Sequence, residues 1–189
     1  MIIVFDGVEG TGKTTLIQLL KNELDKLNFT TKILKHNKGN ERETKMNLFK
    51  NTNYLILLGL TFYAEDLLNI QNEKVILIDR GILTMIIYNT LNKNLNPKKL
   101  IEFYKDVFKE HIDLYIVLIA NKKDIIQRTQ NRNRNFDNFN IDLIEQRQKL
   151  FIKYGKKLFK DKVLIFNTSK TPLETIKNTL IKIIKKEVE

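Results

Sequence analysis

The sequence predicts an α/β protein built on a parallel β-sheet. Apolar segments rich in Ile, Val and Leu alternate with segments of helical periodicity from one end of the 189-residue chain to the other. The first apolar segment, Met1–Phe5, leads through a glycine-containing loop into an amphipathic helix. Parallel sheets of this kind place ligands at the carboxyl ends of their strands. We expect one domain over residues 1–189, long enough to bury a substantial core.

The elements of the first third follow from apolar patterning. Met1–Phe5 is continuously apolar and rich in branched residues, which predicts a buried parallel strand. Lys13–Lys26 is predicted to be a helix because its apolar residues recur at helical spacing. A second strand is predicted at Thr31–Lys35. The polar, non-periodic segment Asn37–Lys45 is predicted to be a loop that leads into the apolar helix Asn51–Ile70.

The middle of the chain repeats this alternation. Glu73–Asp79 is predicted to be a buried strand that ends in a carboxylate, and Gly81–Leu91 is predicted to be a helix. A further helix is predicted from Asn96, because proline is tolerated in a first helical turn. Leu114–Ile119 is the fourth predicted strand, and a helix follows it through about Gln127.

The last third contains the remaining loop, strand and helices. Arg128–Asn140 is polar and basic and is predicted to be a mobile loop. Ile141–Phe159 is amphipathic and predicts a helix. Val163–Asn167 is the last predicted strand, and Thr171–Lys186, with Pro172 near its start, is the closing helix.

Composition limits the class of protein. Hydrophobic residues make up 42% of the chain, which indicates a globular protein. The formal net charge is +11, but the lysines are spread along the chain and no nucleic-acid-binding module is recognised, so no nucleic-acid partner is expected. No apolar run approaches the roughly 18–20 residues of a membrane span, so no membrane partner is expected. The chain has no cysteine and no predicted signal peptide, which indicates a cytoplasmic protein.

The loop after the first strand carries the strongest motif. Gly7-Val8-Glu9-Gly10-Thr11-Gly12-Lys13-Thr14 fits G-x-x-x-x-G-K-[ST], the phosphate-binding P-loop. The backbone N–H groups of Gly10, Gly12 and Lys13 are expected to hold the donor phosphates of ATP. Lys13 can reach the β- and γ-phosphates, and the hydroxyl of Thr14 can bind Mg²⁺.

A second motif, Asp79-Arg80, ends the third predicted strand. At that edge of a parallel sheet, Asp79 can orient Mg²⁺ through water and Arg80 can grip a phosphate with two hydrogen bonds. An ion pair that merely seals the strand end is the structural alternative.

A third segment, Arg128-Thr129-Gln130-Asn131-Arg132-Asn133-Arg134, places three arginines within seven residues. Phosphoryl transfer requires cations around the transferring group, and a closing lid can supply them. The alternative is a solvated basic loop.

Together these segments and Phe166-Asn167-Thr168-Ser169 occur in the order and spacing of the thymidylate kinases. The chain resembles that family along almost its whole length. The resemblance implies the P-loop NTPase fold, with a five-stranded parallel sheet flanked by helices on both faces. It also implies an arginine-bearing lid at about residues 128–140, ATP and Mg²⁺ as cofactors, and a homodimer.

The resemblance also implies site residues on the acceptor side. Asp79–Asn89 resembles the family segment D-R-x-x-x-S-x-x-A-Y-Q, with Thr84 at the Ser, Tyr88 at the Tyr and Asn89 at the Gln that hydrogen-bonds the base. Glu9 matches the P-loop carboxylate that approaches the acceptor sugar and the transferred phosphate. Tyr63 is a further candidate acceptor contact, although aromatic residues in this region are expected mainly in the core.

On the donor side, the P-loop resemblance extends from Gly7 through Thr15. Gly10 and Thr11 occupy positions where some members of the family carry a catalytic Arg. Members that lack this Arg place arginines in the lid instead. The resemblance therefore implies catalytic roles for the lid arginines Arg128, Arg132 and Arg134.

Three departures from the family pattern concern the acceptor site. The family's R-E-P-G-G-type loop is replaced by Leu34–Asn40, whose lysines cannot reproduce a bidentate guanidinium. Phe62–Asp66 matches a family segment like F-A-A-D-R, so Asp66 stands where an Arg is expected near the base. This exchanges a hydrogen-bond donor for an acceptor. Gly81 replaces a larger side chain, which is expected to leave room in the acceptor pocket.

These observations predict a kinase that transfers the γ-phosphate of ATP to a deoxynucleoside monophosphate, with dTMP as the preferred acceptor. A deoxynucleoside kinase is the nearest alternative. A nucleic-acid-associated P-loop NTPase is a rival from another class. A degenerate kinase fold that only binds a partner is a third alternative, against which the intact Lys13 and Thr14 argue.

Overall fold

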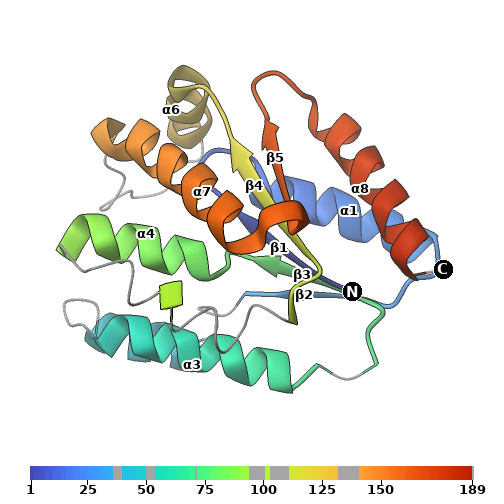
Figure 1. Cartoon of the computed structure of the whole chain (residues 1–189), viewed down its shortest axis with the longest axis horizontal. Coiled ribbons are helices and arrows are strands. Elements are labelled where there is room, and N and C mark those ends of the chain that lie inside the picture. The colour runs from blue at the N-terminus through green and yellow to red at the C-terminus, as the bar shows by residue number, and fades with distance from the viewer. Residues whose placement is uncertain are drawn as a thin grey trace.

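The computed structural model describes residues 1–35, 40–49, 54–70, 72–93, 101–102, 111–131 and 141–188. Within these residues a single sheet lies between two layers of helices (Figure 1). No helix in these ranges is long and apolar enough to cross a membrane.

The sheet has five parallel strands in the order β2-β3-β1-β4-β5. Register pairs Phe5 with Asp79 and Asp6 with Val117, so the carboxyl ends of the three central strands meet at one edge. This confirms the predicted five-stranded parallel sheet. The strands are β1 (Ile2–Asp6), β2 (Thr31–Leu34), β3 (Val75–Asp79), β4 (Leu114–Ile119) and β5 (Val163–Asn167).

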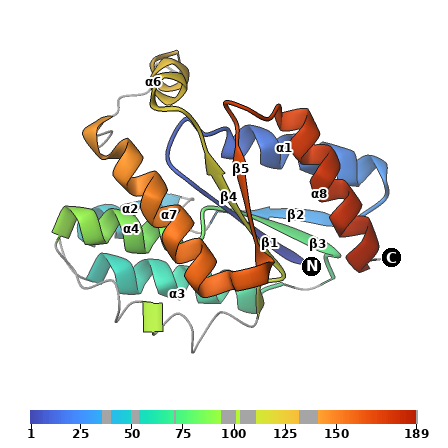
Figure 2. The ribbon, with the colours of Figure 1, turned by 45° about the horizontal axis from the view of Figure 1, so that its top comes forward.

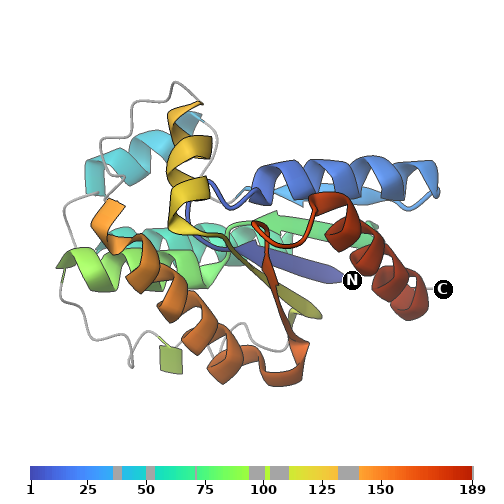
Figure 3. The ribbon, with the colours of Figure 1, turned by 90° about the horizontal axis from the view of Figure 1, so that it is seen from above.

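Helices cover both faces of the sheet, as expected from the near-continuous apolar strands (Figure 3). Along β1, Ile3 and Phe5 point into the cluster under α1 and α8, whereas Val4 points into the opposite cluster under α4 and α7. The period-two alternation of a strand thus divides the core into two halves. The helices of these layers are α1 (Lys13–Lys26), α3 (Tyr54–Leu68), α4 (Ile82–Lys93), α7 (Ile144–Phe159) and α8 (Leu173–Val188).

One predicted loop is partly helical. The sequence predicts a loop over Asn37–Lys45, but helix α2 covers Asn40–Phe49, so the prediction is wrong from Asn40 onward. Lys45 Nζ lies 2.5 Å from Glu41 Oε1 one turn away, and α2 lies against α3 (Figure 2). Such i,i+4 pairs and tertiary packing stabilise a helix that has no strong apolar periodicity.

A second boundary also differs. The predicted basic loop begins at Arg128, but helix α6 (Lys122–Gln130) extends through that residue. Ile125 and Thr129 are buried one turn apart on the inner face of this helix, which explains its continuation. Residues 132–140, which hold the rest of the predicted lid, lie outside the described residues. Of the helix predicted from Asn96, the structure describes residues 101–102, which are helical.

Candidate nucleotide-binding site

The P-loop connects β1 to α1 at the carboxyl edge of the sheet (Figure 1). Gly7, Gly10 and Gly12 have φ angles of 141°, 77° and 89°, which side-chain-bearing residues rarely adopt. A Cβ atom on Gly7 would lie 2.2 Å from the carbonyl oxygen of Leu118 in β4. The hydroxyl of the buried Thr11 donates a hydrogen bond within the loop at 2.8 Å. The loop therefore has the curled form whose N–H groups can surround an anion.

Lys13, the first residue of α1, turns back onto this loop. Its Nζ donates to the carbonyl oxygens of Gly7 and Val8 at 2.8 and 2.7 Å. Burial, together with the positive charge of Arg80, lowers the pKa of Lys13 to about 8 against the opposing effect of nearby carboxylates. A phosphate entering the loop would compete for this ammonium group with neutral carbonyl oxygens, which are weaker partners for a cation.

The two predicted metal ligands lie side by side. Thr14 Oγ1 donates to Asp79 Oδ2 at 3.1 Å, although the two residues are 65 positions apart in the chain. Lys35 Nζ lies 3.8 Å from the same carboxylate oxygen. Thr14 and its neighbour Thr15 are exposed in the first turn of α1. A hydroxyl and a carboxylate brought together this way are oxygen ligands suited to Mg²⁺.

On the other side of the loop, Glu9 joins the P-loop to α4. Arg80 Nη2 donates to Glu9 Oε1 at 2.9 Å, and the hydroxyl of Tyr88 donates to Glu9 Oε2. The structure therefore brings together three residues that the sequence assigns to the acceptor site, from three different segments.

The charge state of Glu9 follows from these contacts. Burial alone would raise the pKa of Glu9, but the charges of Arg80 and Lys13 and the hydrogen bond from Tyr88 lower it to about 2. The same pairing raises the pKa of Arg80 despite its burial. Glu9 is therefore a carboxylate at every physiological pH, with both oxygens already accepting hydrogen bonds.

A fully buried carboxylate, Asp6, fixes the turn that carries Arg80. Asp6 accepts hydrogen bonds from Gly81 N at 3.1 Å, from Thr84 N at 3.3 Å, and from the hydroxyls of Thr84 and Tyr115. Burial raises the pKa of Asp6, and these hydrogen bonds oppose that shift. The structure thus places the Thr84 hydroxyl on Asp6, within the wall of the site.

Backbone geometry at the same turn is unusual. Arg80 has a φ of 78°, a left-handed conformation that costs energy for a residue with a side chain, and its N–H donates to the Phe5 carbonyl at 3.0 Å. A Cβ on Gly81 would lie 2.4 Å from Val4 Cγ1 and 2.7 Å from the Tyr115 hydroxyl. Gly81 is therefore required by close packing against the sheet, and the expectation that it enlarges the acceptor pocket is wrong.

Arg128 is the predicted lid arginine that the structure describes, and it is hydrogen-bonded to the P-loop and to Thr168. Arg128 Nη1 donates to Thr168 Oγ1 at 2.9 Å and to the Gly10 carbonyl at 3.3 Å, and Nη2 donates to the Thr168 carbonyl at 3.0 Å. It ties the P-loop to the segment that follows β5. Arg132 and Arg134 lie outside the described residues.

Asp66 stands where the family pattern places an Arg near the base, and it forms an ion pair with Arg42. Arg42 Nη1 lies 2.9 Å from both carboxylate oxygens of Asp66, and Arg42 Nη2 lies 3.1 Å from Glu65 Oε2. The same guanidinium lies over the ring of Phe62, 4.8 Å from its centre. The arginine that the family pattern places in α3 is thus absent, and α2 supplies a guanidinium to that region instead.

Two other predicted acceptor contacts are placed only in part. Tyr63 is 1% exposed and belongs to the core cluster under α4 and α7. Asn89 lies in α4 one position after Tyr88, and its side chain is outside the described part of the structure.

Sequence reasoning missed four residues of this region: Asp6, Arg42, Tyr115 and Arg147. Asp6 is the last residue of an apolar strand, as Asp79 is, so its position at a strand end could have indicated it. Arg42, Tyr115 and Arg147 are brought to the site by packing between elements, and no local motif marks them.

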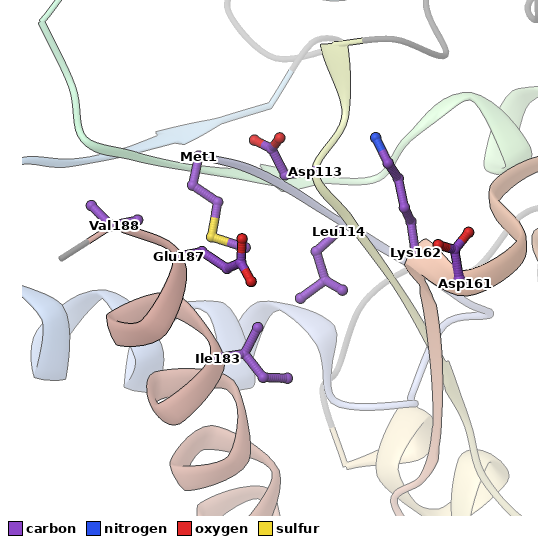
Figure 4. Close-up of a pocket in the computed structure, with 8 residues that line it drawn as sticks. All are labelled: Met1, Asp113, Leu114, Asp161, Lys162, Ile183, Glu187 and Val188. Atoms are coloured by element: carbon purple, nitrogen blue, oxygen red, sulfur yellow. The ribbon is translucent and has the colours of Figure 1, made fainter.

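A separate pocket of about 680 Å³ lies at the opposite edge of the sheet (Figure 4). Its lining includes Met1, Asp113, Lys162 and Glu187, from the amino ends of the strands and the end of α8. Lys162 Nζ is already bound to the Ile112 carbonyl at 2.9 Å. This pocket is distinct from the P-loop site.

Comparison with known proteins agrees with this geometry. A family model described as an AAA domain matches residues 2–156. The thymidylate kinase of Campylobacter hominis is 31% identical over 157 residues, which cover 78% of this chain and 77% of that protein.

Solved structures share the fold. A deoxyadenosine kinase from M. mycoides with bound dATP superposes with a TM-score of 0.70 at 22% identity, covering 98% of this chain and 100% of that one. A thymidylate kinase from Candida albicans superposes with a TM-score of 0.70 at 15% identity, covering 98% and 91% of the two chains.

Proposed function

Because the chain belongs to the thymidylate kinase family, we propose that it transfers the γ-phosphate of ATP to a deoxynucleoside monophosphate, with dTMP as the preferred acceptor. The chain is an ATP-dependent phosphotransferase of the nucleoside monophosphate kinase class. The acceptor base, the bound metal and the role of each site residue are parts of the proposal.

The observation that carries the choice of a monophosphate is the state of Glu9. A nucleoside kinase must activate a hydroxyl with a general base, whose pKa should lie near the working pH. Glu9 has a pKa of about 2, and both of its oxygens accept hydrogen bonds. It is therefore a poor base, whereas a phosphate acceptor is already ionised and requires none.

The cations at the site favour the same acceptor. Lys13 and Arg80 both interact with Glu9 and are the cations of this cluster. An acceptor phosphate would be drawn to Arg80, whose planar group can make two parallel hydrogen bonds to it. Positioning and charge neutralisation of this kind supply most of the catalysis in phosphoryl transfer.

On the donor side, we assign the P-loop from Gly7 to Gly12, which includes Thr11, to the phosphates of ATP. Thr15 in the first turn of α1 is assigned to them as well. Lys13 would leave the loop carbonyls for the β- and γ-phosphates. Thr14 and Asp79 would hold Mg²⁺, and when bound this ion neutralises charge on the donor phosphates. Arg128, Arg132 and Arg134 would complete the cationic surroundings of the transferring group.

Acceptor contacts are assigned to Glu9, Arg80 and Tyr88, with Thr84, Tyr63, Asp66 and Asn89 as further members. A cytoplasmic location and a homodimer are also part of the proposal, on the grounds of the family.

The test is a panel of dTMP, dUMP, dCMP and dAMP with the matching nucleosides, assayed for phosphorylation with ATP and Mg²⁺. We expect turnover with monophosphates, highest with dTMP, and none above background with Lys13→Ala protein. Preferential phosphorylation of thymidine or deoxyadenosine would instead identify a nucleoside kinase. DNA-stimulated ATP hydrolysis without phosphorylation of any acceptor would identify a nucleic-acid-associated NTPase.

A further inference from the structure

A buried arginine outside every sequence motif lies next to the acceptor residues. Arg147, in the first turn of α7, is 2% exposed. Its Nε has no hydrogen-bond partner, and no carboxylate in the described part of the chain forms an ion pair with it. Burying the Nε of a guanidinium without a partner is unfavourable.

Within the described residues, the guanidinium of Arg147 lies over the ring of Tyr88. The guanidinium carbon lies 4.2 Å from the centre of the Tyr88 ring, face on, which is the favoured geometry of a cation–π interaction. The positive charge of Arg147 also acts to lower the pKa of Tyr88, against burial and the charge of Glu9, which raise it. Arg147 therefore influences both the orientation and the electrostatics of this ring.

Hydrogen bonds between the neighbouring residue and the end of β4 hold Arg147 in place. The next residue, Gln148, bonds both backbone groups of Ala120 at the end of β4: Ala120 N donates to Oε1 at 2.7 Å, and Nε2 donates to the Ala120 carbonyl at 3.0 Å. Helix α7 also packs along α4. The first turn of α7 is thus fixed relative to the strand ends on which the site is built.

A continuous set of contacts then runs from α7 to the acceptor arginine. Arg147 packs on Tyr88, Tyr88 donates to Glu9, and Glu9 binds Arg80. Since Tyr88 and Arg80 bind different oxygens of the same carboxylate, a rotation of the Tyr88 ring would change the position of Glu9 and, through it, of the Arg80 guanidinium.

We propose that Arg147 is a positioning residue of the acceptor site, which acts through Tyr88 to hold Glu9 and Arg80 in the arrangement that receives the acceptor phosphate. This inference rests on the proposed function. It assigns Arg147 no contact with ATP, so its loss affects the acceptor and leaves the donor unaffected.

The test is a double-mutant cycle with Arg147→Met and Tyr88→Leu, read as kcat/KM for the acceptor and KM for ATP. We expect Arg147→Met to lower acceptor kcat/KM by about thirtyfold, the size of a desolvated cation–π contact, with KM for ATP unchanged. In the Tyr88→Leu background, Arg147→Met should have little further effect, because the contact through which it acts is gone.

Two further variants keep the test decisive. Arg147→Lys retains the buried charge and stem but lacks the planar group, and should recover only part of the loss. Lys149→Met removes a charge from the exposed face of the same helix and should behave as wild type. If Arg147→Met melts below the assay temperature, Arg147→Lys replaces it in the cycle.

Three outcomes are distinguishable. Coupled effects confined to the acceptor support the inference. Independent, multiplying effects of the two changes, or equal effects on donor and acceptor, would overturn it. A wild type that phosphorylates nucleosides but no monophosphates would overturn both the proposed function and the assignment of a phosphate to this arrangement.

Discussion

The charge states of single side chains in the site are set by burial and neighbours more than by residue type. Lys13 and Glu9 have pKa values of about 8 and about 2, both far from those of the free side chains. Lys13 loses proton affinity because its ammonium group is buried beside Arg80, and Glu9 loses it because two cations surround it. Each of these side chains therefore has a charge that substitution or a change of pH should reveal in the kinetics.

Replacement of Lys13 by Ala should nearly abolish transfer. Its charge interacts with phosphate oxygens more strongly in the transition state than in the ground state, so we expect kcat to fall by about a hundredfold or more. Circular dichroism should show an unchanged fold. Because Lys13 also binds two loop carbonyls, Lys13→Met is the control for lost packing of the stem. A folded variant that keeps most of its kcat would contradict the assignment.

The pH dependence of ATP use should report the same group. Lys13 is protonated below its pKa of about 8 and neutral above it, so kcat/KM for ATP should fall as the pH rises through 8. Bound phosphates favour the charged form, so the corresponding fall in kcat should occur at higher pH. Activity profiles from pH 6 to 10 measure both. A kcat/KM that stays level to pH 10 is the opposing result.

At the scale of elements, contacts between helices and loops assign different roles to residues of one motif. Arg128 belongs to α6 and ties the P-loop to the segment after β5, while Arg132 and Arg134 lie beyond the described end of that helix. The three arginines that the sequence treats as one lid motif therefore need separate tests.

Arg128→Ala should loosen the P-loop. It removes three hydrogen bonds from a charged donor, so we expect KM for ATP to rise and the free energy of unfolding to fall by about 1.5–3 kcal/mol. Calorimetry and steady-state kinetics test this. Arg132→Ala and Arg134→Ala should instead lower kcat with little effect on ATP affinity. Near-normal turnover in both single variants and the double variant would show that the predicted lid is not catalytic.

The pair between α2 and α3 offers a charge-swap test. Asp66→Arg removes the partner of Arg42 and places two guanidinium groups together, so we expect the free energy of unfolding to fall by about 1–3 kcal/mol. Adding Arg42→Asp should restore the pair and recover stability.

In the swapped enzyme the guanidinium extends from α3, and selectivity for dTMP over dCMP should shift by about tenfold if this pair contacts the base. Unchanged selectivity in the swapped enzyme would place the pair outside base recognition.

At the scale of the whole molecule, the sheet order brings distant segments to one edge. The P-loop follows β1, Asp79-Arg80 follows β3, and the segment bound by Arg128 follows β5. Because all five strands run parallel, every one of these segments emerges at the same edge, and the site is assembled by topology.

Oligomeric state is the remaining whole-molecule prediction. The family resemblance implies a homodimer, so light scattering after gel filtration should give twice the 22.4 kDa mass of one chain. Dilution over two orders of magnitude serves as the control for weak association. A single-chain mass at every concentration would contradict the prediction.

The sequence by itself determined the fold class, and it indicated the residues proposed for the donor side of the site. Strand periodicity, the P-loop motif and the charged strand end are local signals, and they identified Gly7–Thr14 and Asp79-Arg80 together with all five strands. Helix α2 was missed because an i,i+4 ion pair and packing on α3 support it in place of apolar periodicity.

The tertiary structure alone decided how these residues act on one another. Asp6 binding to Thr84 and Tyr115, Arg42 on Asp66 and Arg147 on Tyr88 join residues that are 24 to 109 positions apart. Burial and these long-range contacts set the pKa values of Glu9 and Lys13. No local pattern encodes such effects, because desolvation and Coulomb interactions depend on distances that exist only once the sheet has brought the segments together.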